Sequence, residues 1–210
     1  MNQADKAGVL RDTWNFRSAV LTLVSLLTMG FCMAKPIVLV LASNGFQPIE
    51  YSDTRAALEE AGYTVTLVSD RAGKTVDAAG NAGPEVTLTF DSISATDYDG
   101  VFIIGGAGAQ KLMNDATLHK VMKDARDGGL LWGAICISPR ILCKAGLLDN
   151  KKVTGWGFQE FKTIAAQQCP SAMVLNEPVV VDGKLVTANG PSAAKEFGQK
   201  IIDLLKKRNG

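Results

Sequence analysis

Short apolar runs alternate with amphipathic stretches along most of this chain. Apolar runs rich in branched side chains predict buried strands, and apolar residues at intervals of three and four predict helices. Strands are predicted over residues 36–42, 63–69, 101–104 and 129–135, and helices over residues 48–61 and 113–125. This alternation predicts βαβ units with a parallel sheet and right-handed crossovers.

The pattern changes near the C-terminus. Two apolar runs, residues 178–182 and 184–188, flank Asp182-Gly183, a sequence typical of a hairpin turn. A final amphipathic helix follows, with Phe197, Ile201 and Leu205 on one face. Residues 35–210 therefore predict a single α/β domain, a sandwich with a mostly parallel sheet and no internal linker.

The first 34 residues do not fit this pattern. Residues 18–34 form an uncharged, mostly apolar run preceded by Arg11 and Arg17. The run is typical of a signal peptide, although Cys32-Met33-Ala34 is a poor match to the small-residue cleavage site of such peptides. It is slightly short for a membrane-spanning helix. Translation from Met33 is the alternative. If residues 18–34 are a signal peptide, the protein is predicted to be exported or periplasmic. If translation starts at Met33, it is predicted to be cytoplasmic.

Composition narrows the class of protein. The chain has 210 residues, 47% hydrophobic side chains and a formal charge of +1, as expected of a soluble globular protein. Nucleic acid is excluded as a partner because no basic footprint is present, and no membrane partner is expected apart from the leader. With one histidine and no CxxC pair, no metal site is expected. Removal of the leader leaves three cysteines, so at least one thiol lacks an intramolecular partner.

Ligands of parallel α/β sheets sit beyond the carboxyl ends of the strands. Cys136 occupies such a position, directly before a predicted helix over residues 139–145 with Ser138 as its N-cap. The positive helix end would lower the pKa of the thiol. Ala134 and Ser138 leave room for a strand-to-helix elbow that exposes a nucleophile. The alternative is a buried cysteine that acts as a small hydrophobe.

Two other strand ends carry candidate chemistry. Gly105-Gly106 ends one strand, and its amides could form an oxyanion hole with the amide of Ile137, although a tight turn needs the same glycines. Glu50 lies in the first turn of a helix, where a carboxylate suits the helix dipole. It could also meet Cys136 across the crevice, keep its proton and hydrogen-bond the thiolate. His119 lies mid-helix, so we expect no Cys-His-acid triad.

These segments, taken in order, resemble the ThiJ/PfpI superfamily over residues 35–210. The resemblance rests on Gly45-Phe46 with Glu50, and on the stretches YDGVFIIGGAGAQKL, AICISP, AGLLDNKKVTGW and EPVVVDGKLVTANGP. It implies a flavodoxin-like three-layer sandwich, a homodimer, and Cys136 as the elbow nucleophile with protonated Glu50 as its partner. It also implies that the amides of Gly106 and Ile137 surround the sulfur, and that the pocket is formed by Gly105, Trp156, Asn189, Gly190 and Pro191.

Departures from the superfamily pattern bear on the reaction. PfpI-type members carry histidine where this chain has Ile137, which disfavours a peptidase. Other members have a histidine in the segment that matches residues 153–156, where this chain has Trp156. The chain is thus most similar to ThiJ-like members without the active-site histidine. Asn189 replaces an expected arginine, which changes the polarity of the pocket.

The leading hypothesis is a cofactor-free enzyme of the glyoxalase III or protein deglycase type. Cys136 would attack a 2-oxoaldehyde or its adduct, and Glu50 would move the proton that converts it to a hydroxy acid. The alternative is a redox-sensing or chaperone-like stress protein in which Cys136 oxidises to a sulfinate. A hydrolase or hydratase acting on a nitrile-like carbon is the third hypothesis, which Glu50 disfavours because such members use aspartate.

Overall fold

The structure is a computed structural model that describes residues 34–209. The predicted leader over residues 18–34 lies outside the described residues except for Ala34, so both it and the domain boundary after residue 34 stay predictions. Within residues 34–209, no helix has the length and apolar character needed to cross a membrane.

A seven-stranded sheet organises the domain in the order β11-β12-β8-β7-β1-β3-β6. Its strands are parallel except for β11, which pairs antiparallel with β12. The strands are β1 Ile37–Leu41, β3 Val65–Ser69, β6 Leu88–Thr89, β7 Gly100–Ile103, β8 Leu131–Ile135, β11 Val179–Asp182 and β12 Leu185–Ala188. The predicted flavodoxin-like α/β fold with a mostly parallel sheet is therefore confirmed, as is the C-terminal hairpin.

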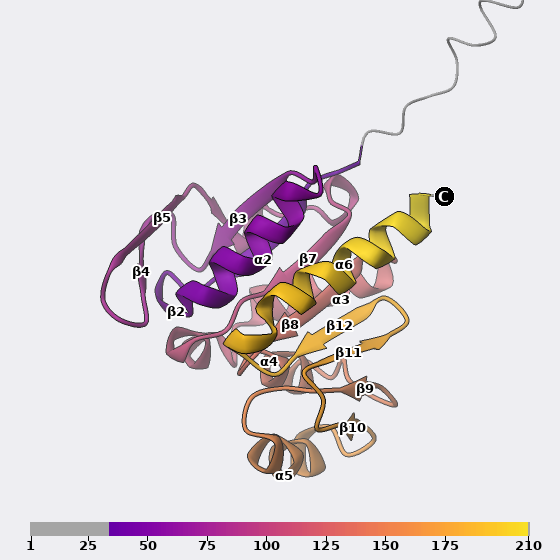
Figure 1. Ribbon diagram of the computed structural model, residues 1–210. Coiled ribbons are helices and arrows are strands. Elements are labelled where there is room, and N and C mark those ends of the chain that lie inside the picture. The colour runs from indigo at the N-terminus through magenta and orange to yellow at the C-terminus, as the bar shows by residue number, and fades with distance from the viewer. Residues whose placement is uncertain (1–33, 210) are drawn as a thin grey trace, which may run out of the picture. The chain divides into compact units, whose positions relative to one another are not determined.

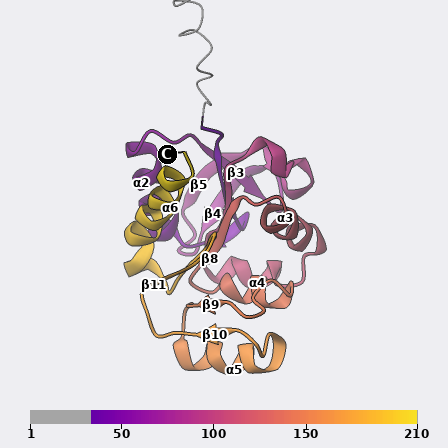
Figure 2. The same cartoon turned by 90° about the vertical axis from the view of Figure 1, so that its right-hand side faces the viewer.

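Helices cover both faces of this sheet (Figure 2). Helices α2 (Pro48–Glu60) and α6 (Ala194–Asn209) pack on one face, and α3 (Ala116–Asp127) and α4 (Pro139–Lys144) on the other. The alternation of β1 explains this arrangement, because Val38 and Val40 join the α3–α4 side of the core while Leu39 joins the α2–α6 side. Strands buried on both faces appear in the sequence as the continuous apolar runs described above.

Several elements outside the main sheet carry no strong periodicity and were not predicted. Short strands β2 (Asn44–Phe46), β4 (Gly73–Asp77) and β5 (Ala82–Val86) form a small second sheet at one end of the domain (Figure 1). At the opposite end, β9 (Lys152–Val153) pairs with β10 (Met173–Val174), and α5 (Phe158–Gln168) lies between them in sequence. The 3₁₀ turns are η1 Phe90–Ser92, η2 Ala95–Asp97, η3 Ala107–Leu112 and η4 Pro191–Ala193.

The helix expected from Met113 begins later. Asp115 is the N-cap of α3 and its carboxylate accepts the N–H of Leu118 at 2.8 Å, so the helix starts at Ala116. Met113 instead follows η3, a tighter helical turn with its own hydrogen bonds. Apolar spacing alone joined the two segments in the sequence, because both place side chains on the same core.

A disulfide joins the C-terminal ends of two helices on one side of the sheet. Cys143 of α4 is bonded to Cys169, the C-cap of α5, and both residues are buried. Among the described residues, Cys136 is the free cysteine. The expectation of at least one thiol without an intramolecular partner thus corresponds to Cys136 among the described residues, although the sequence did not indicate which residues pair.

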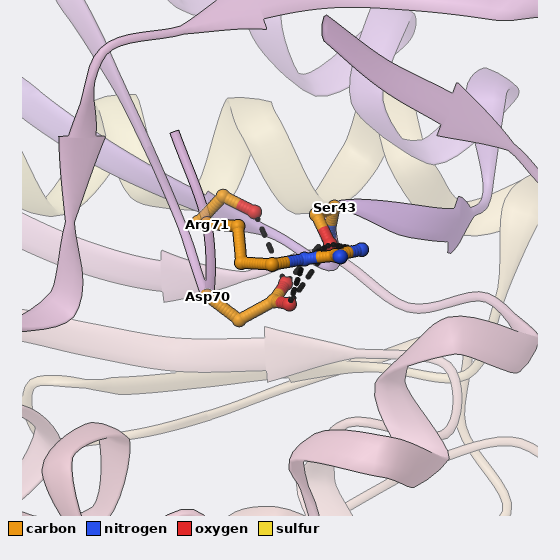
Figure 3. A network of polar contacts seen from close by, with 4 residues as sticks. Ser43, Asp70 and Arg71 are labelled. Carbon is orange, nitrogen blue, oxygen red and sulfur yellow. Dashed lines mark hydrogen bonds and ion pairs between the residues drawn. The ribbon is translucent and has the colours of Figure 1, made fainter. Parts of the chain in front are cut away.

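A polar network fixes the turn that follows β1 (Figure 3). The carboxylate of Asp70 accepts both the backbone N–H of Ser43, at 2.7 Å, and its hydroxyl, at 2.8 Å. The guanidinium of Arg71 donates to the same hydroxyl. Because Asp70 follows β3, the network locks together the ends of two neighbouring strands just before the segment that leads to Glu50.

Candidate active site

Cys136 lies at a sharp elbow between β8 and α4, with a φ of +65°. A left-handed backbone is uncommon for a residue with a side chain and is held only where the surroundings impose it. Here the N–H of Cys136 donates to the carbonyl of Ala188 at 2.9 Å, and its carbonyl accepts the N–H of Trp156 at 2.7 Å. The elbow predicted from the small flanking residues is therefore present, and its side chain is partly exposed.

Ser138 occupies the predicted N-cap position of α4, but its side chain does not cap the helix. Its backbone is helical and its hydroxyl makes no cap hydrogen bond. The buried hydroxyl donates instead to the carbonyl of Ile104 at 3.0 Å. This bond ties the elbow to the end of β7, which a sequence cannot indicate because the two residues come from different βα units.

Glu50 lies in the first turn of α2 and is fully buried. One carboxyl oxygen, Oε2, accepts the N–H of Gly105 at 2.9 Å. The other oxygen, Oε1, has no N–H or O–H partner among the described residues. The thiol of Cys136 contacts this carboxyl group and lowers its pKa. The structure thus brings Glu50 and Cys136 together beyond the ends of β1 and β8, as the sequence analysis expected.

Burial raises the pKa of Glu50 to about 7, and the contacts with Cys136 and the N–H of Gly105 lower it only in part. The expected tendency of this carboxyl to keep its proton is therefore present up to neutral pH. Near pH 7 the group exchanges its proton readily in either direction.

The expectation of a lowered thiol pKa is wrong. Burial, then the charge of Glu50 and its hydrogen bond, raise the pKa of Cys136 to about 12. The N–H groups of Ile137 and Gly106 face the sulfur and act in the opposite direction. Helix α4 has six residues and contributes too little positive charge to overcome burial beside a carboxylate. The raised pKa favours the protonated thiol at neutral pH.

The two glycines after β7 are required by close packing. A Cβ atom at Gly105 would lie 2.6 Å from the Cβ of Cys136 and 2.7 Å from Oε2 of Glu50, so the lack of a side chain here leaves room for both groups. Gly106 has a φ of +108°, and a Cβ there would lie 2.4 Å from the carbonyl oxygen of Gly45. The alternative of a tight turn that needs glycine is therefore present, and the same turn points the Gly106 amide at the sulfur. The oxyanion hole stays a prediction.

Of the remaining predicted pocket residues, Trp156 and Gly190 are in contact with each other. Trp156 is 54% exposed, and its indole packs on Gly190, where a Cβ would lie 2.7 Å from Cε3 of the ring. Asn189 and Pro191 flank Gly190 in the chain, and the N–H of Asn189 donates to the carbonyl of Pro178. The contact between Trp156 and Gly190 thus lies next to the elbow, since the backbone N–H of Trp156 bonds to the carbonyl of Cys136.

His119 lies in α3, away from this cluster. Its Nε2 is 3.0 Å from the carbonyl of Met113. The placement agrees with the expectation that it is not the base for Cys136. No group of three or more acidic, histidine or cysteine side chains suited to a metal ion occurs in the described part of the chain.

Sequence reasoning missed Arg140, which lies in α4 one turn after Cys136. Its side chain is 10% exposed and donates to the carboxylate of Glu160 at 2.9 Å and to the carbonyl of Trp156 at 3.1 Å. Its neighbours Pro139, Ile141 and Leu142 are buried. The available signal was a cation among buried apolar residues with no acid three or four residues away, which indicates a distant partner.

Comparisons with known proteins agree with this fold. The model of the DJ-1/PfpI family matches residues 36–204. General stress protein 18 of Bacillus subtilis is 30% identical over 83% of this chain and all of the relative. The crystal structure of a ThiJ/PfpI domain protein from Brachyspira murdochii has a TM-score of 0.77 at 27% identity, covering 83% of this chain and 98% of that one. Drosophila melanogaster DJ-1beta has a TM-score of 0.72 at 26% identity, covering 82% and 91%.

Proposed function

Because the chain belongs to the DJ-1/PfpI family, we propose that it is a cysteine-dependent enzyme of the glyoxalase III or deglycase type that acts on 2-oxoaldehydes or their adducts. One observation carries the proposal: Cys136 and Glu50 meet around Gly105, with the amides of Gly106 and Ile137 facing the sulfur. This arrangement supplies a nucleophile, a proton carrier and an oxyanion hole.

The reaction begins with the ionised form of Glu50. Its carboxylate accepts the thiol proton as the sulfur of Cys136 attacks the aldehyde carbon, and the carbonyl electrons move to oxygen. Once Glu50 is neutral, the charge that raised the pKa of Cys136 is gone while the amides remain. The alkoxide lies against the amides of Gly106 and Ile137 and then takes the proton from Glu50, which gives a hemithioacetal.

The next steps move hydrogen within the adduct. Glu50 removes the hydrogen of the first carbon as a proton, and the released electron pair forms an enediolate with the neighbouring carbonyl. Glu50 returns the proton to the second carbon, while the hydroxyl proton on the first carbon passes to the oxygen on the second. The product is a thioester of a 2-hydroxy acid, which water cleaves to the free acid and the thiol of Cys136.

The pH profile tests the role of Glu50. A base must be ionised, so we expect kcat/KM to rise as pH increases through about 7, the pKa of this carboxyl. In Glu50→Gln the rise should be absent from the residual activity. A rise that persists in the variant would assign it to another group.

The main experiment follows methylglyoxal and its hydroxy-acid product by NMR with the purified full chain. We expect Cys136→Ser and Glu50→Gln each to lower turnover by about a hundredfold or more, a typical effect of removing a nucleophile or a general base. His119→Gln is the matched control and should retain full activity. In deuterium oxide, exchange of the proton on Glu50 with solvent before its return would place deuterium at the second carbon of the product, whereas direct return would leave hydrogen there. Undiminished turnover in either site variant would overturn the proposal.

The redox-sensing alternative is less well supported by this site. The thiolate is the form that peroxide oxidises, and burial beside Glu50 raises the pKa of Cys136 to about 12. We therefore expect mild peroxide to convert Cys136 to a sulfinate slowly, as read by mass spectrometry. The predicted homodimer and aldehyde ligand also remain proposals.

A further inference from the structure

Trp156 is held by its backbone on both sides. Its N–H donates to the carbonyl of Cys136, and its carbonyl accepts a hydrogen bond from the Arg140 guanidinium at 3.1 Å. Its side chain packs on Gly190, which has a φ of +152° and no room for a Cβ. The indole is nevertheless 54% exposed, so a well-fixed aromatic surface faces solvent beside Cys136.

Arg140 has the geometry to provide this support. Its guanidinium is nine-tenths buried and spans two different acceptors, the carboxylate of Glu160 and the carbonyl of Trp156. A planar fork of N–H groups can serve both at once, whereas an ammonium group is a single point donor. Glu160 is 64% exposed, so an ion pair with it does not by itself require a buried arginine. The burial of Arg140 is explained by its second hydrogen bond, to the carbonyl of Trp156.

The same residues connect Arg140 to the elbow. Arg140 lies four residues after Cys136 in the sequence, and a Cβ at Gly155 would lie 3.1 Å from the carbonyl oxygen of Cys136. The segment that carries Trp156 therefore packs against the backbone of Cys136, and Arg140 donates a hydrogen bond to the same segment. A shift of this segment would move the indole and loosen the elbow together.

We propose that Arg140 is a positioning residue that holds the indole of Trp156 beside Cys136 as an apolar platform, and that this platform selects aldehydes with an apolar or aromatic substituent. The inference rests on the function proposed above and adds the substrate class. An aromatic ring stacks on a fixed indole through dispersion and quadrupole interactions, which a hydrogen atom or a methyl group cannot match.

The test compares phenylglyoxal with glyoxal as substrates of the full chain. The selectivity ratio is kcat/KM for phenylglyoxal divided by kcat/KM for glyoxal. We expect Trp156→Ala to lower this ratio about fivefold, the usual effect of losing one aromatic contact. Arg140→Gln and Arg140→Lys should lower it by a similar factor, mainly through KM for phenylglyoxal, because neither side chain makes both hydrogen bonds.

A double variant separates positioning from general damage. If Arg140 acts through the indole, Arg140→Gln combined with Trp156→Ala should have the same ratio as Trp156→Ala alone. Glu160→Gln is the matched control, since it removes the charge partner but leaves the bond to the Trp156 carbonyl, and it should keep the ratio of the unmodified protein. Additive effects, or an unchanged ratio in Trp156→Ala, would overturn the proposal.

Tryptophan fluorescence tests the positioning role without any substrate, and therefore independently of the proposed function. Arg140→Gln should change the acrylamide quenching of tryptophan fluorescence, and the change should vanish in a Trp156→Phe background. Failure of every aldehyde to react would reject the proposed function and the substrate class with it. Unaltered quenching in Arg140→Gln would reject the positioning role by itself.

Discussion

At the scale of single residues, the site depends on the absence of a side chain at Gly105. Gly105→Ala would place a methyl group 2.6 Å from the Cβ of Cys136 and 2.7 Å from Oε2 of Glu50, so the two groups must move apart. We expect aldehyde turnover to fall about a hundredfold, with a loss of about 2 kcal/mol in the free energy of unfolding. Turnover assays and urea unfolding measure the two effects.

Gly62→Ala is the matched control for this change. Gly62 is also a glycine, and an added Cβ there would have no atom within 4 Å, although its φ of +86° itself disfavours a side chain. It should lose stability and keep its activity. Full activity in Gly105→Ala would show that the proximity of Glu50 to Cys136 is not needed.

Glu50 also makes stability depend on pH. Its pKa is 4.5 in the unfolded chain and about 7 in the folded one, so the folded state holds the proton more tightly. The stabilisation is complete below pH 4.5 and is lost as pH rises through about 7. The loss amounts to about 3 kcal/mol relative to Glu50→Gln, which keeps an acceptor for Gly105 but does not ionise. Urea unfolding of both proteins at pH 5 and pH 8 measures it, and parallel pH dependences would contradict it.

The positions of the site residues could be predicted from the local sequence pattern, but their ionisation could not. Cys136, Glu50 and the glycine pair follow buried strands, so their position at one edge of the sheet could be inferred. The ionisation of Cys136 could not, because burial and the charge of Glu50 arise from the tertiary structure. Arg140 was missed because both of its partners lie in a segment with no pattern that placed it beside α4.

At the scale of elements, the disulfide between Cys143 and Cys169 holds α4 and α5 together. The two cysteines are 26 residues apart, and closing a loop of this size in the unfolded chain is worth about 3.5 kcal/mol. We expect the double variant Cys143→Ala/Cys169→Ala to lose about this much in guanidinium unfolding. Reductant should destabilise the unmodified protein and leave the double variant unchanged; equal sensitivity of the two would contradict the pairing.

Element prediction succeeded where periodicity was strong. The predicted strands and helices of the main sheet coincide with β1, α2, β3, β7, β8 and α6 to within a few residues. Elements of two to five residues, such as β2 and β9, leave too few positions for a pattern. Helix α5 has only Phe161 and Ala165 buried, so its apolar face is too narrow to have been recognised in the sequence.

At the scale of the whole molecule, both sides of the core are built between Ile37 and Leu205. Just before β1, the N–H of Lys35 donates to the carboxylate of Asp99, which also pairs with Arg208 of α6 at 2.6 Å. We therefore expect a chain that starts at Ala34 to match the full chain in melting temperature and in aldehyde turnover. Calorimetry and kinetics check this, and a lower melting temperature would show that earlier residues support the fold.

The position of β12 next to β8 has a consequence for biosynthesis. The N–H of Cys136 bonds to the carbonyl of Ala188, and the indole of Trp156 packs on Gly190. During translation, more than 50 residues must be added after Cys136 before Ala188 and Gly190 are synthesised. The sulfur acquires its final surroundings only when translation is nearly finished, so fragments released early should lack the reactivity of the complete protein.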